Sequence, residues 1–243
     1  MPYKGGVLTA SSPYEPLEWT DSLVAAIWEY YGTRPETFFT FQFGDRILEE
    51  TQRYIPQGAT VCDYGCGAGF LLKHLLETHR AAGIDFTKGN LEKTADLVQD
   101  HPNLIGLFHP SECASLAASF DAIYFVETVE HLLDHHVVPT FSTLANLLKP
   151  GGIVICTTPN DEDLEDQQVF CPVTRKVFHR YQHMQAFTAK SLEYLFADHG
   201  FTTLKTFTTD FAARTLKARL KARWRPALGR KNPHLIYVGR KPG

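Results

Sequence analysis

The sequence lacks any long apolar run. Hydrophobic residues make up 44% of its 243 positions, but they come in runs of about four to eight residues separated by polar turns. A membrane-spanning helix needs roughly 18 or more consecutive apolar residues, so no transmembrane segment is predicted. Residues 1–6 also lack the charged start, apolar stretch and cleavage site of a signal peptide. We therefore expect a cytoplasmic protein.

Cysteine is scarce and its positions form no regular pattern. The chain has five cysteines, which is an odd number, and two of them fall inside expected strands. A disulfide framework needs an even, regularly spaced set, and a zinc knuckle needs closely spaced pairs. The pattern therefore indicates reduced thiols. The cysteines are Cys62, Cys66, Cys113, Cys156 and Cys171.

Acidic residues are missing from the last part of the chain. Residues 211–243 carry ten of the 24 Lys and Arg side chains and no Asp or Glu, so the rest holds 14 basic and 27 acidic groups. The basic segment 214–231 could meet an anionic partner such as phosphate, nucleic acid or a membrane face, or could be a solvated surface helix. Leu216, Leu220 and Trp224 fall four apart within it. Docking of this helix on the domain is the simplest expectation, and a membrane surface or a phosphate-bearing substrate are the alternatives.

Short apolar strands alternate with helical segments from residue 59 onward. This alternation predicts βαβ units, and hence an α/β fold with a mostly parallel sheet and helices on both faces. Before it, residues 1–18 read as an extended lead-in, followed by helices at 20–31, where Thr20 is a capping residue, and at 43–54. The expected strands are 60–64, 81–85, 104–108, 120–126, 152–157, 202–208 and 235–240; the expected helices are 70–78, 89–99, 137–148 and 189–199; residues 159–187 read as a polar insert.

The most informative stretch is a buried strand that runs into three glycines and then a helix. Gly65, Gly67 and Gly69 are spaced by two, whereas a dinucleotide-binding loop places its third glycine five positions after the first. The nearby carboxylate of Asp63 would repel a phosphate, but it suits a ligand that carries an ammonium and a sulfonium. These residues therefore point to S-adenosylmethionine (SAM). Asp85, at the end of the next expected strand, can accept both ribose hydroxyls of an adenosine.

These residues resemble the class I SAM-dependent methyltransferase family over about residues 40–240. Further landmarks are the segment Phe120 to Leu132, the Lys149-Pro-Gly-Gly turn, and Thr157-Thr-Pro-Asn after the fifth strand. The resemblance implies a Rossmann-like, seven-stranded, mostly parallel sheet with an antiparallel last strand. It also implies a lead-in and helix at 1–40, and a catalytic domain at 41–243 with inserts at 159–187 and 211–233. The implied cofactor-binding residues are Asp63, Tyr64, Gly65, Gly67, Gly69, Asp85, Phe86, Val126 and Glu127.

The chain departs from the family pattern at one position, and one of its motifs points to a subgroup of the family. Many relatives hold the adenine amino group with an acid just after the third strand, where this chain has Glu112 a few residues on. Val129-Glu-His-Leu is similar to ubiquinone-type O-methyltransferases and to many glycan or natural-product methyltransferases. This likeness implies that Glu130 and His131 lie at the substrate edge. In the insert, which covers the active site in the family, the candidate substrate contacts are His179, Arg180, Tyr181 and His183.

His131 is the favoured general base, with Glu130 and His183 orienting it or the substrate. An imidazole with a pKa near ~6.5 can remove a hydroxyl proton; the alternative is that Glu130 and His131 only cap the next helix. The primary prediction is SAM-dependent O-methylation of a small-molecule or glycan hydroxyl, without a metal, giving S-adenosylhomocysteine.

Two other functions remain open. Glu127, Glu130, His131 and His183 resemble the metal-binding set of small-RNA 2′-O-methyltransferases, in which a divalent ion orients ribose hydroxyls. The basic segment would suit RNA. The third hypothesis is a SAM-binding but non-catalytic partner protein. The choice between oxygen, nitrogen and carbon acceptors also stays open, because the pocket shape decides it.

Overall fold

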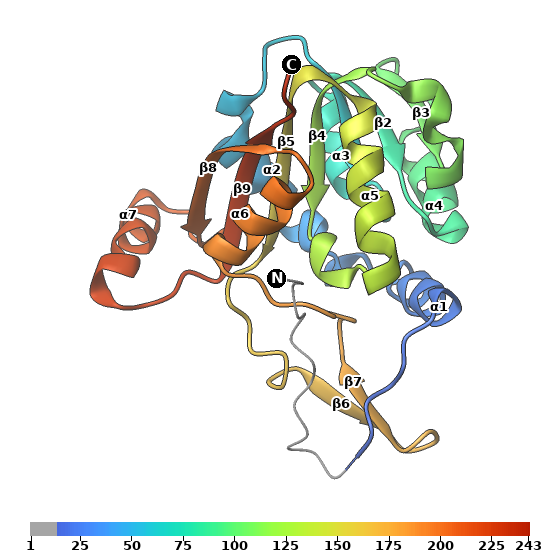
Figure 1. Cartoon of the computed structure of the whole chain (residues 1–243), viewed down its shortest axis with the longest axis vertical. Helices are drawn as coiled ribbons and strands as arrows, with labels where there is room; N and C mark the ends of the chain where they lie inside the picture. The colour runs from blue at the N-terminus through green and yellow to red at the C-terminus, as the bar shows by residue number, and fades with distance from the viewer. Residues whose placement is uncertain (1–13) are drawn as a thin grey trace.

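A computed structural model describes residues 14–243, so most of the predicted lead-in, residues 1–13, lies outside the described residues. The described chain forms one twisted sheet with helices on both faces, and a small hairpin that projects away from it (Figure 1). The seven strands of the sheet are β1 (Thr60–Tyr64), β2 (Arg80–Ile84), β3 (Leu104–Phe108), β4 (Phe120–Val126), β5 (Leu148–Pro159), β8 (Thr202–Thr209) and β9 (His234–Arg240).

The strands follow the order β3-β2-β1-β4-β5-β9-β8. Strands β1 to β5 pair in parallel, while β9 is antiparallel to both β5 and β8. The predicted seven-stranded sheet with an antiparallel last strand is therefore confirmed. The chain builds outward from β1 in one direction with β2 and β3, and then returns to the other side of β1 with β4. Ligands of open α/β sheets bind in the crevice at such a switch point, beyond the carboxyl ends of the strands.

Two hydrophobic cores cover the two faces of the sheet. Side chains of β4 alternate between them, with Ile123 and Phe125 in one core and Tyr124 and Val126 in the other. This period of two is what a strand buried on both faces requires. Helices α2 (Phe39–Thr51), α3 (Phe70–Leu76) and α4 (Lys88–Val98) contribute to one core; α5 (Asp134–Leu147) and α6 (Ala189–Asp198) contribute to the other.

Helix α1 (Asp21–Tyr31) and the start of α2 lie at the carboxyl ends of the strands, where both line a cavity. Helix α1 is capped by Thr20, whose side chain accepts from the Leu23 N–H, as predicted. Helix α2 begins at Phe39, earlier than the expected residue 43. The Phe39 ring packs against the rings of Phe211 and His234, with centroids 5.5 and 4.9 Å away. Because both partners lie far away in the sequence, local periodicity could not place this helix start. Short 3₁₀ turns at Pro35–Thr37 and Gln52–Tyr54 flank α2.

The insert contains a hairpin that the sequence pattern did not predict. Strands β6 (Gln168–Cys171) and β7 (Lys176–His179) pair antiparallel and form their own two-stranded sheet. The segment before α1 binds to the hairpin, since the Leu17 N–H donates to the carbonyl of Val177 over 2.8 Å. Each strand is four residues long, which is too short for a clear alternation of polar and apolar residues.

The basic segment forms helix α7 (Leu216–Trp224) and the 3₁₀ turn η5 (Pro226–Leu228) between β8 and β9. The helix docks on the domain, as expected, but its apolar stripe does not make the contact. Arg214 pairs with Asp45 and Arg219 with Glu49, while the leucines and the tryptophan stay exposed. Within residues 14–243, no helix combines the length and apolar character that crossing a bilayer requires.

Candidate active site

A cavity of about 1050 Å³ lies where the carboxyl ends of β1, β2, β4 and β5 meet. Its walls come from the turns after these strands, from α1 and the start of α2, from α5, and from the insert. Ligand pockets usually enclose roughly 300–1,000 Å³. The cavity therefore has room for two small molecules side by side.

The turn after β1 is built from glycines with positive φ. Gly65, Gly67 and Gly69 have φ of 81°, 54° and 83°. A Cβ on Gly65 would lie 2.4 Å from the Thr128 hydroxyl oxygen, and one on Gly67 would lie 2.8 Å from the Phe38 ring. Any other residue would be strained and would collide. The turn therefore brings bare backbone to the cavity, where Gly65 and Gly67 form part of the wall.

Asp85 closes the other side of this turn. Its Oδ2 accepts from the Gly67 N–H over 2.9 Å, and its Oδ1 accepts from the Thr87 N–H over 2.8 Å. Burial raises the pKa of Asp85 to about 6, although these backbone hydrogen bonds act to lower it. Each carboxylate oxygen keeps a second acceptor site. Asp85 lines the cavity and can accept two hydroxyl groups there.

Asp63, one of the predicted cofactor residues, is set back from the cavity wall. Neither Asp63 nor Gly69 is among the residues that line the cavity. The Asp63 carboxyl is buried beside Asp85 and against the backbone of Leu72 in the first turn of α3. Burial, reinforced by the charge of Asp85, raises the pKa of Asp63 to about 8. Asp63 therefore lies inside the domain, between Asp85 and the first turn of α3.

The other predicted cofactor residues line the cavity; they are Tyr64, Phe86, Val126 and Glu127. Asn90, which the sequence did not single out, joins them, and its buried Oδ1 has no partner among the described residues. Glu112 caps the 3₁₀ turn at Pro110–Leu116 by accepting from the His109 N–H. It does not line the cavity, whereas His109 does.

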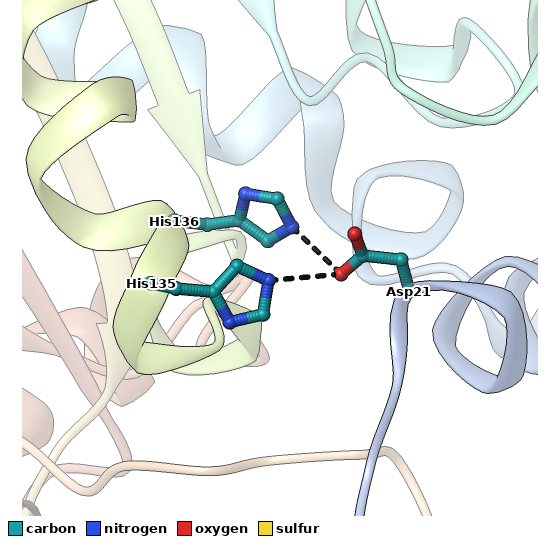
Figure 2. Close-up of side chains that lie close together, drawn as sticks. All are labelled: Asp21, His135 and His136. Atoms are coloured by element: carbon teal, nitrogen blue, oxygen red, sulfur yellow. Dashed lines mark hydrogen bonds and ion pairs between the residues drawn. The ribbon is translucent and has the colours of Figure 1, made fainter.

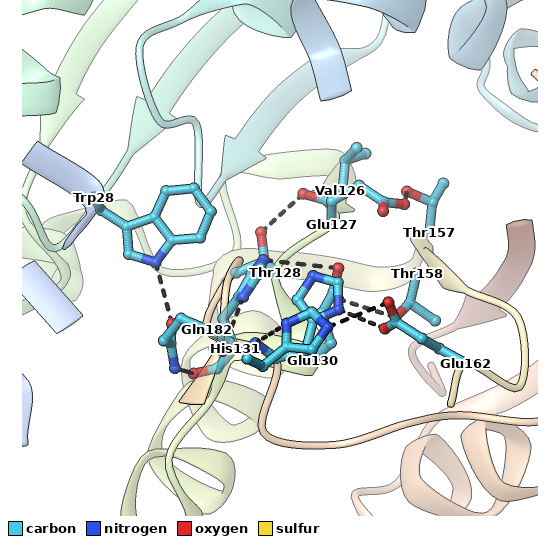
Figure 3. Close-up of polar contacts among 12 residues, drawn as sticks. Trp28, Val126, Glu127, Thr128, Glu130, His131, Thr157, Thr158, Glu162 and Gln182 are labelled. Carbon is cyan, nitrogen blue, oxygen red and sulfur yellow. Dashed lines mark hydrogen bonds and ion pairs between the residues drawn. The ribbon is translucent and has the colours of Figure 1, made fainter. Parts of the chain in front are cut away.

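Beyond the predicted cofactor residues, the cavity wall holds a cluster of imidazoles and carboxylates (Figure 3). Glu130 and His131 lie on a 3₁₀ turn, Val129–His131, directly after β4. His183 comes from the insert, and its ring lies 4.9 Å from the ring of His131 and 4.3 Å from that of His179. The structure thus brings together the three residues predicted to be catalytic. Of the other insert residues, Tyr181 lines the cavity, while His179 and Arg180 do not.

Glu162 is the site residue that the sequence did not reveal. Its Oε2 lies 2.5 Å from Nδ1 of His183, and its Oε1 lies 3.5 Å from Nε2 of His179. Burial acts to raise the pKa of Glu162, but the hydrogen bonds from the two histidines lower it to about 2. Glu162 is therefore a carboxylate, and it holds the proton of His183 on Nδ1. It stands in an acidic run, 161–163, whose pattern is that of an ordinary solvated loop.

Glu130 and His131 are held in their uncharged forms by burial. Burial raises the pKa of Glu130 well above its usual range, and the neighbouring Glu127 raises it further. Burial and the neighbouring His183 keep the pKa of His131 well below its usual range. The Thr158 hydroxyl donates to Oε2 of Glu130 over 3.0 Å. Burial thus favours the uncharged form of both side chains.

The predicted four-residue metal set is assembled only in part. One ligand atom each from Glu130, His131 and His183 lies within 4.8 Å of the others. Glu127 is not in this group, because its Oε1 accepts from the Thr157 hydroxyl over 2.7 Å (Figure 3). Of the predicted set, three residues are therefore grouped. A second group meets the same distance condition and consists of Glu162, His179 and His183.

A second polar contact ties α1 to α5 at the cavity rim. Asp21, at the start of α1, accepts through one carboxylate oxygen from both His135 and His136 on α5 (Figure 2). The N–O distances are 3.2 and 2.8 Å. The hydrogen bond from His136 lowers the pKa of Asp21. Because these side chains are exposed, the contact orients the helices more than it stabilises the fold.

Comparison with known proteins identifies relatives of this arrangement. A family model described as a methyltransferase domain matches residues 38–206. The 2-methyl-6-phytyl-1,4-hydroquinone methyltransferase of Synechocystis sp. is 26% identical over 180 residues, which are 70% of this chain and 55% of that protein. The ubiquinone biosynthesis O-methyltransferase of Dinoroseobacter shibae is 34% identical over 108 residues, which are 43% of this chain and 42% of that protein. The chain thus spans about half the length of these curated relatives.

A solved structure shares the fold over almost the whole chain. It is the 1,6-didemethyltoxoflavin-N1-methyltransferase of Burkholderia thailandensis with bound 1,6-didemethyltoxoflavin and S-adenosylhomocysteine. Its TM-score is 0.63 at 16% identity, and the match covers 99% of this chain and 100% of that one. At this identity the likeness supports the fold alone.

The Asp63→Asn variant should be more stable than the wild type at pH 8 and nearly equal to it at pH 4. Because the pKa of Asp63 is raised to about 8 in the folded state, the stability that the neutral carboxyl contributes is lost as pH rises from about 4 to 8. A rise in pKa from 3.8 to about 8 is worth roughly 5 kcal/mol at about 1.4 kcal/mol per pKa unit. Because 1 kcal/mol shifts Tm by about 2–4 °C at this size, we expect a Tm increase at pH 8 of roughly 10–20 °C. Thermal melts at both pH values measure it.

Asp121→Asn is the matched control, with the opposite sign. Asp121 accepts from Lys149 and from the Thr60 N–H, and its pKa is lowered. The control should therefore lose stability at pH 8. Equal melting temperatures for wild type and Asp63→Asn at pH 8 would contradict this prediction, because they would show that ionisation of Asp63 does not destabilise the folded state.

Proposed function

The chain belongs to the class I SAM-dependent methyltransferase family, and from this premise we propose that it methylates a hydroxyl group on a small, largely apolar acceptor. The single observation that carries the proposal is the His183–Glu162 dyad in the wall of a cavity whose acceptor side is lined mainly by apolar side chains. A neutral imidazole held by a carboxylate is suited to taking a proton from a hydroxyl.

The residues of the glycine turn fit the cofactor. SAM, when bound, supplies a methyl group on a positively charged sulfur, which an acceptor oxygen displaces in line. Gly65 and Gly67 offer backbone without side chains, and Asp85 offers two spare acceptor sites for ribose hydroxyls. Phe86 stands next to Asp85 with a partly exposed ring that can cover an adenine.

The other part of the cavity favours an acceptor with an aromatic or apolar body. Its wall from α1, the start of α2 and the segment before α5 is made mainly of carbon, which excludes water from a bound acceptor. Sugars, in contrast, need many polar partners. The two curated relatives are named for a hydroquinone and for ubiquinone biosynthesis, which agrees with this chemistry. The apolar lining residues are Val24, Ala25, Trp28, Phe38, Phe39, Phe43, Leu132 and Leu133.

In the proposed reaction His183 is the general base. Its Nδ1 proton is held by Glu162, which leaves the lone pair on Nε2 free to accept a hydroxyl proton. The carboxylate then stabilises the imidazolium that forms, as an acid does in a catalytic triad. This assignment differs from the sequence-based prediction, which favoured His131 as the general base. His131 has no carboxylate within hydrogen-bond distance, since Glu130 is 3.8 Å away and neutral, so we assign it to positioning.

Metal-assisted methylation of an RNA end is the second candidate. The convergence of Glu130, His131 and His183 supports it, because one carboxylate and two imidazoles form a known type of divalent-metal site. The proposal without metal is preferred because Glu127 is turned toward Thr157 and does not join the other three residues as a fourth ligand.

Asp85→Ala should weaken SAM binding by roughly 10–100-fold, because hydrogen bonds to a charged group contribute about 1.5–3 kcal/mol each. Calorimetric titration of SAM measures the change. Asp96→Ala, on the exposed face of α4, is the control and should bind as the wild type does. Equal binding by Asp85→Ala would mean that the cofactor site lies elsewhere.

Glu162→Gln should lower kcat by roughly 100-fold, the lower end of what a general base contributes, with little effect on the KM for SAM. Radiolabelled SAM with a panel of phenols and hydroquinones gives the rates. Asp166→Asn, an exposed acid of the same insert, should keep the wild-type kcat. If Glu162→Gln is fully active while His131→Gln is inactive, His131 is the base and the dyad assignment is wrong.

Metal content separates the two candidates. We expect less than stoichiometric divalent metal in the purified protein, and unchanged activity after treatment with EDTA. Stoichiometric metal that is lost in His183→Gln, together with activity that EDTA abolishes and Mg²⁺ or Mn²⁺ restores, would favour the metal-assisted candidate.

A further inference from the structure

Helix α7 exposes a stripe of large apolar side chains. Leu216, Leu220 and Trp224 repeat every four residues, which places them on one side of the helix, and Leu228 follows in η5. Their exposed fractions are 75%, 50%, 63% and 72%. A surface helix normally turns its apolar side toward the core. This helix does the reverse.

The contacts of α7 with the domain fix this orientation. Ala222 is buried against the domain, and its carbonyl accepts from Nδ2 of Asn232 over 3.0 Å. Arg225, just after the helix, pairs with Asp210 over 2.9 Å. Ala218 and Ala222 stand on the side of the helix opposite Leu220. The apolar stripe therefore points into solvent as long as the helix stays docked.

Cations border the stripe on both sides. At 100° per residue, Lys217 and Lys221 lie along one edge and Arg223 along the other. In the described part of the chain, no ion pair within 4 Å involves these three side chains or Arg230. The arginines that do pair, such as Arg214 and Arg219, lie toward α2. The outward face thus combines apolar side chains with unneutralised positive charge.

We propose that α7 and η5, residues 216–228, bind the surface of an anionic lipid bilayer. A helix with an apolar stripe between rows of Lys and Arg lies in the interfacial plane, with the stripe in the acyl boundary and the cations at lipid phosphates. Trp224 has the amphipathic ring that favours this depth. This proposal is independent of which acceptor the enzyme methylates.

The stripe favours a bilayer over a nucleic acid. A helix that contacts a phosphate backbone uses its charged and polar groups, and the exposed leucines and tryptophan would gain no apolar contact there. A bilayer provides that contact in its acyl chains. Pro233 and His234, which follow η5 by a few residues in the sequence, line the cavity. In Figure 1, α7 projects beyond β8, where a flat surface can reach it.

Vesicle sedimentation of the full chain tests the proposal. The wild type should bind phosphatidylcholine vesicles that contain about one-third phosphatidylglycerol, and bind pure phosphatidylcholine vesicles at least about tenfold more weakly. The double variant Leu220→Gln/Trp224→Gln should lose at least about tenfold in vesicle affinity. Lys217→Gln/Lys221→Gln should lose a similar factor, and high salt should weaken wild-type binding.

The matched control removes exposed apolar side chains elsewhere. Val173 and Tyr194 are 89% and 62% exposed, on the hairpin and on α6. Val173→Gln/Tyr194→Gln should bind anionic vesicles as the wild type does. All three variants should keep wild-type thermal melts and wild-type turnover of a water-soluble acceptor, so a failure of the membrane proposal is distinct from a failure of the proposed reaction.

Three results would each overturn the proposal. The first is no wild-type binding to anionic vesicles. The second is equal vesicle binding by the wild type and Leu220→Gln/Trp224→Gln. The third is binding of a short single-stranded RNA, but not of vesicles, that Lys217→Gln/Lys221→Gln loses and Leu220→Gln/Trp224→Gln retains, which would make α7 a nucleic-acid surface.

Discussion

The backbone turn between β1 and α3 is the constraint on which the site depends. Its glycines adopt positive φ and let Thr128 and Phe38 approach the chain more closely than any side chain would permit. Hydrogen bonds fix the turn to the end of β2. The carbonyl of Ile84 accepts from two N–H groups of the turn, and the side chain of Asp85 accepts from a third. Because parallel strands end at one edge of the sheet, this local turn faces the ends of β2, β4 and β5.

Burial decides the charge states around that edge. Asp63 and Glu130 are buried without full pairing, so their pKa values rise and their neutral forms are favoured. Glu162 is also largely buried, but it has two histidine partners and remains a carboxylate. The site therefore contains the Glu162 carboxylate beside His131 and His183, whose pKa values are lowered mainly by burial. Such an arrangement can accept one proton without a large change in solvation.

The insert and the N-terminal helix complete the cavity by binding to the sheet edge. The carbonyl of Glu130 accepts from the Met184 N–H, and the side chain of Gln182 joins the carbonyl of His131 to the indole N–H of Trp28. These segments line the cavity from elements separate from the glycine turn. This separation explains how one cofactor site can serve different acceptors.

The sequence by itself determined the sheet, the glycine turn and the acids near it, because a strand period of two and glycine spacing are local properties of the chain. It could not determine the partners of those groups. Glu162 meets His183 across 21 residues, Phe39 begins a helix because of His234, and the leucines of α7 face outward because Ala222 docks. Each of these outcomes depends on which distant surfaces pack together, and only the tertiary structure decides that.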